Sequence, residues 1–148
     1  MLTIPYKEIL NILLVEDDEV FVRDIKQIFK TNKITHSLYT ATNGLEALEM
    51  LRSQDGKPPV IPQRSRLILL ELNLPKMNGW EFLGKLRSDP KLKIIPVVIL
   101  SSCCDKDEEK LKLYNLNVAG CISKPIAPSE LTEVLITILK YWTINELI

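Results

Sequence analysis

The sequence predicts an α/β domain, in which a parallel β-sheet carries helices on both of its faces. Three observations lead to this fold class. Short aliphatic runs alternate along the chain with longer segments whose apolar residues recur every three or four positions, as strands alternate with helices. The aliphatic runs are not interrupted by polar residues, which is typical of strands buried on both faces. The chain of 148 residues is long enough for one such domain with a sizeable core.

The composition is that of an ordinary globular protein. Hydrophobic residues make up 46% of the chain, and 19 basic residues balance 19 acidic ones. A chain without excess positive charge gives no support for a nucleic-acid partner. The first residues lack the pattern of a secretory signal, and no apolar run is long enough to span a bilayer. We therefore expect a cytoplasmic protein with no nucleic acid and no membrane as partner.

Five strands and five helices are expected from the alternation. The strands are expected at residues 10–15, 35–40, 67–71, 95–100 and 118–122. The helices are expected at residues 18–31, from 43, at 80–88, at 105–115 and from 128. Asp17 or Asp18 is suited to cap the first helix, and Asn43 with Glu46 fits a capping box at the start of the second.

The apolar spacing within the helices predicts which side chains face the sheet. These are Leu45, Leu48 and Leu51 in the second helix, Leu111 and Tyr114 in the fourth, and Leu131, Val134, Leu135, Ile138, Leu139 and Trp142 in the fifth. Each set lies on one side of its helix, so the opposite sides are expected to meet solvent.

Three segments lie outside these elements: a leader at residues 1–8, a long loop at 54–66 and a tail at 143–148. The loop contains three prolines and a glycine, which are incompatible with a helix. It exceeds the usual length of a connection between a helix and a strand. We favour a tolerated surface insertion, with a partner-binding loop as the alternative.

The three cysteines are Cys103, Cys104 and Cys121. An odd number of cysteines in a cytoplasmic chain argues against a disulfide framework. A single histidine and the lack of a Cys-x-x-Cys motif argue against a zinc site. We expect three reduced thiols. A link between Cys103 and Cys121 is the weaker alternative, because these residues follow or lie in neighbouring expected strands.

Polar residues with related chemistry follow four of the expected strands. Glu16 and Asp17 follow the first strand, Glu71 ends the third, Ser101 follows the fourth, and Lys124 comes just after the fifth. The carboxyl ends of parallel strands form one edge of the sheet, where ligands bind in folds of this class. Oxygen ligands suit Mg²⁺, and an ammonium group suits a phosphoryl oxygen. The sequence therefore predicts a site for a divalent cation and a phosphoryl group.

This set of motifs resembles the receiver domain of two-component response regulators, and among those the single-domain regulators paired with cyanobacterial phytochromes. The matching segments are residues 12–18, 67–79, 95–102 and 124–125, within a similarity that runs from about Ile9 to Trp142. The resemblance implies a flavodoxin-like (βα)5 fold with strand order 2-1-3-4-5. It also implies a signalling protein that is not an enzyme and whose partner is a sensor histidine kinase, here a phytochrome.

The resemblance also assigns roles to individual residues. Asp17 would hold Mg²⁺ directly, Glu16 would hold it through water, and the backbone carbonyl of Asn73 would complete the shell. Lys124 would contact a phosphoryl oxygen and would precede a cis peptide bond to Pro125. Ser101 would be the switch hydroxyl. Cys121 stands where many receivers have a switch aromatic residue, so the usual aromatic movement is not expected here.

Glu71 departs from the family pattern, because receivers accept phosphate on an aspartate at this position. Glutamate is longer by one methylene group, which moves its carboxylate by about 1.5 Å. A displacement of about 1 Å can lower a rate a hundredfold. We expect a poor phosphoacceptor with weakened Mg²⁺ binding, in which the Glu71 carboxylate pairs with Lys124. The alternative is a pseudo-receiver that only binds proteins.

Two other function classes find little support in the sequence. The first expected strand is not followed by a glycine-rich phosphate loop, which a nucleotide-binding domain of this shape would need. Hydrolase chemistry lacks a candidate Ser-His-Asp set or a metal-binding histidine set.

The end of the chain offers an apolar surface. Tyr141, Ile144 and Ile148 would lie on an exposed face if the last helix continued to the end of the chain, with Trp142 beside them. Together with the resemblance, this predicts a homodimer formed through these four residues. The alternative is an end that folds back on the domain.

Overall fold

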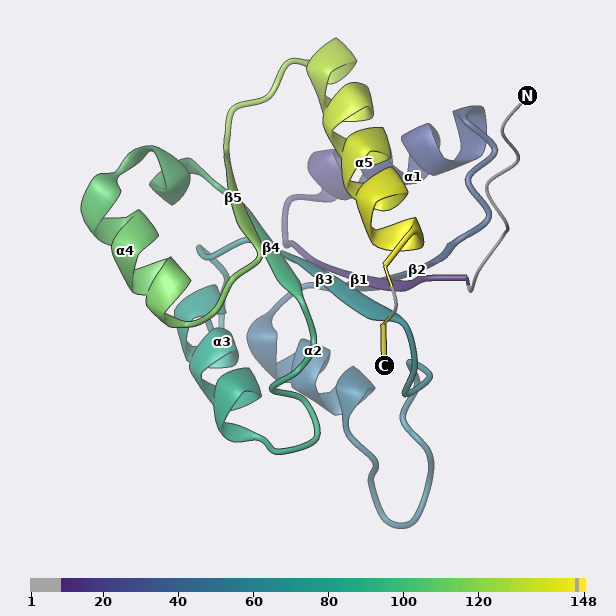
Figure 1. Ribbon diagram of the computed structural model, residues 1–148, viewed down its shortest axis with the longest axis vertical. Helices are drawn as coiled ribbons and strands as arrows, with labels where there is room; N and C mark the ends of the chain where they lie inside the picture. Colours follow the sequence, from purple (N-terminus) through teal and green to yellow (C-terminus); the bar gives the residue numbers. More distant parts are fainter. Residues whose placement is uncertain (1–8, 146) are drawn as a thin grey trace.

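The structure is a computed structural model that describes residues 9–145 and 147–148, so the expected leader at residues 1–8 lies outside the described residues. Its centre is a five-stranded parallel sheet with the order β2-β1-β3-β4-β5 (Figure 1). The strands are β1 Asn11–Val15, β2 Ser37–Ala41, β3 Arg66–Leu70, β4 Val97–Ser101 and β5 Gly120–Ser123. The helices are α1 Glu19–Thr31, α2 Gly44–Leu51, α3 Gly79–Ser88, α4 Asp107–Asn115 and α5 Pro128–Thr143, with a short 3-10 helix, η1, at Ser102–Asp105. The expected fold class and strand order are confirmed.

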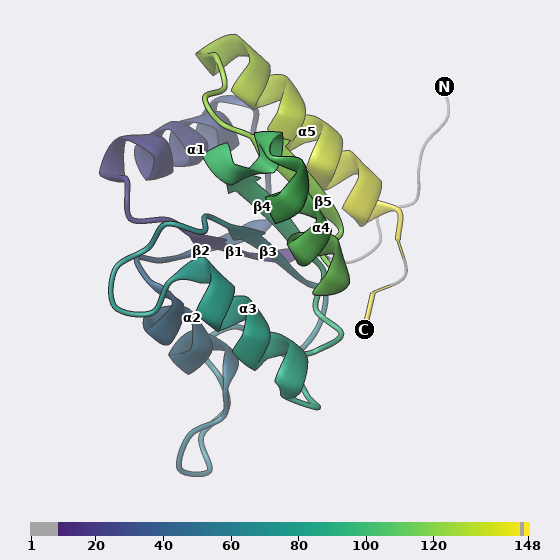
Figure 2. The same ribbon diagram turned by 90° about the vertical axis from the view of Figure 1, so that its left-hand side faces the viewer.

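The helices form two layers around the sheet (Figure 2). Leu13 and Val15 of β1 point to the core beneath α2 and α3, which also contains Leu113 of α4. Ile12 and Leu14 point to the opposite core, against α1 and α5. Successive strand residues face opposite sides, so an unbroken aliphatic strand fills both cores at once. The buried sheet provides a rigid frame for the loops at its edges.

Polar side chains cap the N-termini of α1, α2 and α3. Asp18 accepts hydrogen bonds from the backbone N–H groups of the first turn of α1. Asn43 caps α2 by accepting from the Glu46 N–H, and Asn78 caps α3 in the same way. The expected capping box at α2 is only half formed, because the Glu46 carboxylate accepts from the Thr42 hydroxyl instead.

Three residues expected to face the sheet do not, although Leu48 and Leu51 of α2 are buried as expected. Leu45 is 46% exposed, whereas Ala47 of the same helix is fully buried. In α4, Leu111 is 65% exposed and Tyr114 is 50% exposed, and Leu113 is the residue that enters the core. The expected helix at residues 105–115 is in fact split into η1 and α4. Leu111 and Tyr114 both follow this break and share one side of α4, whereas the side that carries Leu113 enters the core.

The cysteines also differ from expectation. Cys104 and Cys121 form a disulfide with their Cα atoms 5.5 Å apart, while Cys103 remains a free thiol. Three reduced thiols were therefore the wrong expectation, and the alternative partner for Cys121 was wrong by one residue. The turn of η1 buries Cys104 and leaves Cys103 partly exposed, and this choice between adjacent residues depends on the local turn.

The long loop between α2 and β3 is anchored at its base by Arg66. The buried Arg66 guanidinium donates hydrogen bonds to the carbonyl oxygens of Leu51 at 3.0 Å, Ile61 at 2.6 Å and Pro62 at 2.8 Å. The part of the loop farther from the sheet projects away from the domain (Figure 1). A fully buried Ile61 and a charged anchor thus fix the ends of a segment whose middle extends outward.

The last helix ends earlier than the expected apolar face requires. Thr143 is the last residue of α5, and Ile144 is its C-cap. The backbone carbonyl of Ile148 accepts a hydrogen bond from the Ser65 N–H at 3.2 Å, and Leu147 packs against the core of α1 and α5. Continuation of the helix was therefore the wrong expectation, and the end of the chain folds back on the domain.

Across the described ranges, none of the helices combines the length and apolar character needed to cross a membrane.

Candidate functional site

The carboxyl ends of β1 and β3 bring two glutamates together. Val15 of β1 is in register with Leu70 of β3, and Glu16 and Glu71 are the residues that follow them. Because the strands are parallel neighbours, both carboxylates emerge at the same edge of the sheet. At the same edge, Ser101 ends β4 in register with Ser123 of β5. Lys124 follows Ser123, so the register places this lysine at the same edge, two strands from Glu71 and three from Glu16.

The Lys124 ammonium group lies between the two glutamates. Its Nζ donates a hydrogen bond to Glu16 Oε1 and another to Glu71 Oε1 at 3.2 Å. The side chains of Glu16, Glu71 and Lys124 are 3%, 11% and 17% exposed. The Phe21 ring covers the ammonium from α1, with its centroid 4.1 Å from Nζ. The Lys124 ammonium, shielded from water, is thus the shared counter-charge of the buried Glu16 and Glu71 carboxylates.

The remaining oxygens of both carboxylates accept backbone hydrogen bonds. The Asp18 N–H donates to Glu16 Oε2 at 3.4 Å, and the Leu72 N–H donates to Glu71 Oε2 at 2.7 Å. Burial raises the pKa of Glu16 above its usual range, although the hydrogen bond and the charge of Lys124 oppose this effect. Every carboxylate oxygen of the pair is therefore already bound by a donor from the protein.

The lysine is fixed through its backbone as well. The Lys124 N–H donates to the Ser101 carbonyl at 3.2 Å. The peptide bond between Lys124 and Pro125 is cis, as the resemblance implied.

The Ser101 hydroxyl lies in the strand that neighbours β5, but it is directed to the start of η1. Ser101 is fully buried, and its Oγ accepts a hydrogen bond from the Cys103 N–H at 3.4 Å. In this structure the hydroxyl therefore caps η1, a common use of a serine at such a position.

Asp17 and Asn73 are both exposed and lie outside the Glu16, Lys124 and Glu71 group. Asp17 lines a hollow of about 370 Å³ together with Glu16 and with Arg23 and Lys26 of α1. Within residues 9–145 and 147–148, histidine, cysteine and acidic side chains form no group of three arranged to hold a metal ion. The oxygen donors are chemically suited to Mg²⁺. Their present arrangement fits the ammonium of Lys124 and not a metal ion.

The fold and this site define a class of protein. Residues 12–136 match the family described as the response regulator receiver domain, and the chain belongs to this family. Receiver domains generally serve in signalling, and those of phytochrome response regulators pair with sensor histidine kinases.

The relatives include a response regulator and a probable regulatory protein. The chain is 37% identical over 131 residues to response regulator Rcp1 of Synechocystis sp. This match covers 88% of this chain and 87% of Rcp1. The chain is 31% identical to the probable methanogenesis regulatory protein FilR2 of Methanothrix harundinacea, and this match covers 88% of this chain and 82% of FilR2.

Solved structures of two related proteins are also similar. The phosphorylated cyanobacterial phytochrome response regulator RcpA is 34% identical with a TM-score of 0.81, and the match covers 95% of this chain and 99% of RcpA. The Mn²⁺-bound form of Rcp1 is 33% identical with a TM-score of 0.75, and the match covers 91% and 95%. The chain is therefore related to phytochrome response regulators.

Sequence reasoning missed the role of Phe21 and of the two backbone donors, Asp18 and Leu72. Phe21 was not among the residues expected at the site. Its position in the first helical turn after Glu16 was a usable signal, because that turn begins at the same sheet edge as the acids. The backbone donors left no signal in the sequence.

Proposed function

We propose that this protein is a stand-alone cytoplasmic response regulator that receives its signal from a phytochrome histidine kinase, and that Glu71 impairs its phosphorylation. Membership of the receiver family supports the two-component role. The similarity to RcpA, a cyanobacterial phytochrome response regulator, supports this choice of kinase.

The pairing of Glu71 with Lys124 carries the proposal. In phosphoryl transfer to a receiver, a carboxylate oxygen attacks phosphorus in line while nearby cations neutralise the phosphoryl oxygens. Here Glu71 Oε1 lies 3.2 Å from the Lys124 ammonium, and Glu71 Oε2 accepts from the Leu72 N–H. The carboxylate that would attack phosphorus is thus paired with the ammonium group that would neutralise the phosphoryl oxygens. The longer side chain also shifts the carboxylate by about 1.5 Å, the length of one C–C bond.

The same pairing weakens Mg²⁺ binding in this proposal. Glu16, Asp17, Glu71 and the Asn73 carbonyl are the groups that would supply oxygen ligands, and the ion would neutralise phosphoryl charge. Two of the carboxylates are held by Lys124, so a metal ion would have to displace the ammonium. The protein therefore rests in one signalling state, in which the buried charges are already balanced.

The direct test is incubation with acetyl phosphate and Mg²⁺, followed by intact mass measurement. We expect no stable adduct of about 80 Da, the mass of a phosphoryl group, on the wild-type protein, and an adduct on the Glu71→Asp variant. Glu81→Asp makes the same chemical change at an exposed position in α3 and should remain unlabelled. A stable adduct on wild-type Glu71 would refute the impaired acceptor.

A second candidate is a pseudo-receiver that binds proteins without phosphorylation. The observation in its favour is that Lys124 already occupies the space between Glu16 and Glu71. The two candidates separate with Glu71→Asp. Labelling of this variant supports a receiver with one altered residue, whereas an unlabelled variant that still binds the kinase supports the pseudo-receiver.

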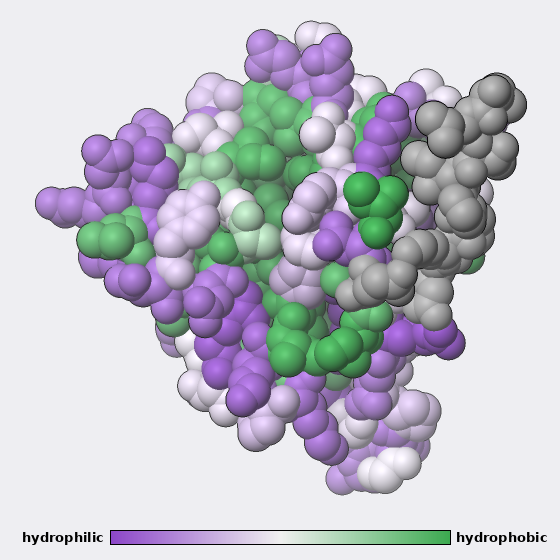
Figure 3. All heavy atoms as spheres, viewed as in Figure 1, coloured by the Kyte–Doolittle hydropathy of each residue, from purple (hydrophilic) through white to green (hydrophobic). Residues whose placement is uncertain are grey.

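We further propose that the C-terminal region contributes to a homodimer through Tyr141, Trp142, Ile144 and Ile148. Tyr141, Ile144 and Ile148 are 57%, 53% and 85% exposed, and hydrophobic side chains gather near the end of the chain on the face in Figure 3. Trp142 packs against the core and meets the Tyr141 ring edge-on, with centroids 5.0 Å apart, so it would support the surface from below.

Light scattering at tens of micromolar protein tests the dimer. We expect the mass of two chains for the wild-type protein and of one chain for Ile144→Glu. Val60→Glu, at another exposed apolar position (64% exposed) in the long loop, should remain dimeric. A monomeric wild-type protein would exclude the dimer at that concentration.

A further inference from the structure

The disulfide lies beside the receiver site and encloses one helix. Cys104 in η1 and Cys121 in β5 are 17 positions apart in sequence, and α4 lies wholly between them. Cys121 is in register with Ile99 of the adjacent β4. The bond therefore joins η1, just after β4, to β5. It closes a loop of residues 104–121 that contains the whole of α4.

Within this loop α4 has a small buried face, although Arg87 of α3 donates hydrogen bonds to the carbonyl oxygens of Leu116 at 2.7 Å and Asn117 at 3.1 Å, just after the helix. Leu113 is the one buried residue of α4, and the N-cap residue Lys106 makes no side-chain capping bond. The first turn of α4 carries three acidic residues, and Leu111 is exposed. A helix with so small a buried face depends on its connections for its position. The disulfide provides one such connection.

The bond is also linked to the acid–lysine group through Ser101. The Ser101 hydroxyl caps η1 by accepting from the Cys103 N–H, and the Ser101 carbonyl accepts from the Lys124 N–H. Movement of η1 would therefore release the hydroxyl of Ser101, the same residue whose carbonyl oxygen binds the Lys124 N–H. The state of the cysteine pair and the state of the site share this one residue.

We propose that Cys104 and Cys121 form a reversible thiol–disulfide switch, which sets the position of η1 and α4 and takes a small disulfide such as glutathione disulfide as its oxidant. Because it regulates the receiver site, the switch rests on the proposed function, but it needs no phosphoryl transfer. It gives a signalling input to a receiver whose acceptor carboxylate is already engaged by Lys124.

The chemistry is thiol–disulfide exchange. The Cys121 thiolate, which is less buried than Cys104, attacks one sulfur of glutathione disulfide, forms a mixed disulfide and expels one glutathione thiolate. The Cys104 thiolate then attacks the Cys121 sulfur and expels the second. In sum, two cysteine thiols lose two protons and two electrons, and one glutathione disulfide becomes two glutathione thiols. Excess glutathione reverses both steps.

The first test measures the exchange itself in the full chain. The folded protein is equilibrated with glutathione and glutathione disulfide in graded ratios, and free thiols are counted by maleimide labelling and mass measurement. We expect three labels on the reduced chain and one on the oxidised chain, with a Cys104–Cys121 peptide link in the latter. The transition should fall within the range of these buffers.

Cysteine variants locate the switch. Cys103→Ser removes the free thiol next to the pair and should keep the transition, whereas Cys104→Ser and Cys121→Ser should abolish it. Three results would overturn the switch: a pair that stays reduced at every ratio, a bond that opens only when the protein unfolds, or a link that uses Cys103.

Hydrogen exchange tests the structural consequence. Backbone amides of residues 102–116 should exchange at least about tenfold faster in reduced than in oxidised wild-type protein, because the closed loop has opened. The effect should persist in Cys103→Ser. Equal exchange in both wild-type states would overturn the switch, whether or not a serine variant folds. Acetyl phosphate labelling of Glu71 would overturn the impaired acceptor alone, so the two failures can be distinguished.

Discussion

The Lys124 Nζ and Glu71 Oε1 lie 3.2 Å apart, with the same nitrogen bound to Glu16. This relationship joins the ends of β1, β3 and β5 through one ammonium group. Because all three side chains are at most 17% exposed, the charges interact with little screening by water. The site is therefore part of the structural core as well as the proposed point of signalling.

Replacement of Lys124 by Met should destabilise the protein. It would leave two buried carboxylates facing each other without a counter-charge, and breaking a buried ion pair on one side costs about 3–5 kcal/mol. Urea unfolding at neutral pH measures the loss. Lys110→Met breaks an exposed pair with Asp107 and should change stability by less than about 1 kcal/mol. Equal effects of both variants would contradict a structural role for the site.

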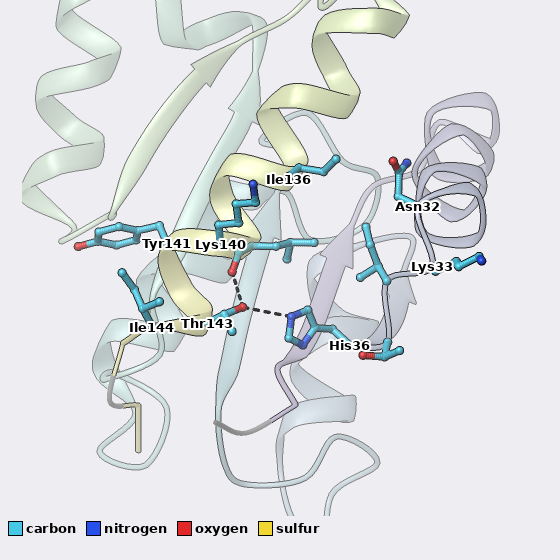
Figure 4. A pocket seen from close by; sticks show the side chains of 11 residues that line it. Asn32, Lys33, His36, Ile136, Lys140, Tyr141, Thr143 and Ile144 are labelled. Carbon is cyan, nitrogen blue, oxygen red and sulfur yellow. Dashed lines mark hydrogen bonds between the residues drawn. The ribbon is translucent and has the colours of Figure 1, made fainter. Parts of the chain in front are cut away.

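His36 should titrate below the ordinary pKa of histidine. Its Nδ1 accepts a hydrogen bond from the Leu10 N–H, and its Nε2 lies 3.2 Å from the Thr143 Oγ, on the wall of a hollow of about 610 Å³ beside α5 (Figure 4). Protonation of Nδ1 would break the first bond, and burial lowers the pKa of the imidazole.

This shift predicts how stability depends on pH. Between the lowered folded pKa and the unfolded value of about 6.5, the unfolded chain binds more protons than the folded one. The contribution of His36 is therefore complete above pH of about 6.5 and is lost as the pH falls through the folded pKa. Because His36 is the single histidine, one imidazole resonance in an NMR titration reports it. A pKa at or above the ordinary value would refute the prediction.

Arg66 should hold the long loop to the domain. Its guanidinium serves three carbonyl oxygens, on Leu51, Ile61 and Pro62, and hydrogen bonds to charged groups contribute about 1.5–3 kcal/mol each. We expect Arg66→Met to lower the unfolding free energy by about 3 kcal/mol and to speed proteolytic cleavage within residues 54–65. Arg52→Met, at a more exposed arginine paired with Asp89, should have little effect on cleavage.

Truncation in α4 should distinguish its true inner face. Leu113 is fully buried, so Leu113→Ala should cost about 2–5 kcal/mol by creating a cavity. Leu111 is 65% exposed, and Leu111→Ala should change stability by no more than about 0.5 kcal/mol. Thermal unfolding of the two variants gives the comparison. The reverse order would show that α4 is rotated from the position described.

The sequence by itself determined the fold class, the edge of the sheet where the site lies and the residues gathered there. Unbroken aliphatic runs mark buried strands, and the residue after each run must emerge at the carboxyl edge, so Glu16, Glu71 and Lys124 were predictable. The cap at Asn43 was also predictable, and Asp18 was one of two candidates for the first helix, because a cap depends on neighbours within one turn.

Only the tertiary structure decided which atoms meet. The pairing of Cys104 with Cys121, the burial of Leu113 in place of Leu111, and the hydrogen bond from Ser65 to Ile148 each depend on how distant segments lie within a few ångströms of one another. Periodicity reports the burial of a face, which is a local property averaged over several residues. A bond between two side chains depends on the rotation and end point of both elements, and neither quantity is written in the spacing of apolar residues.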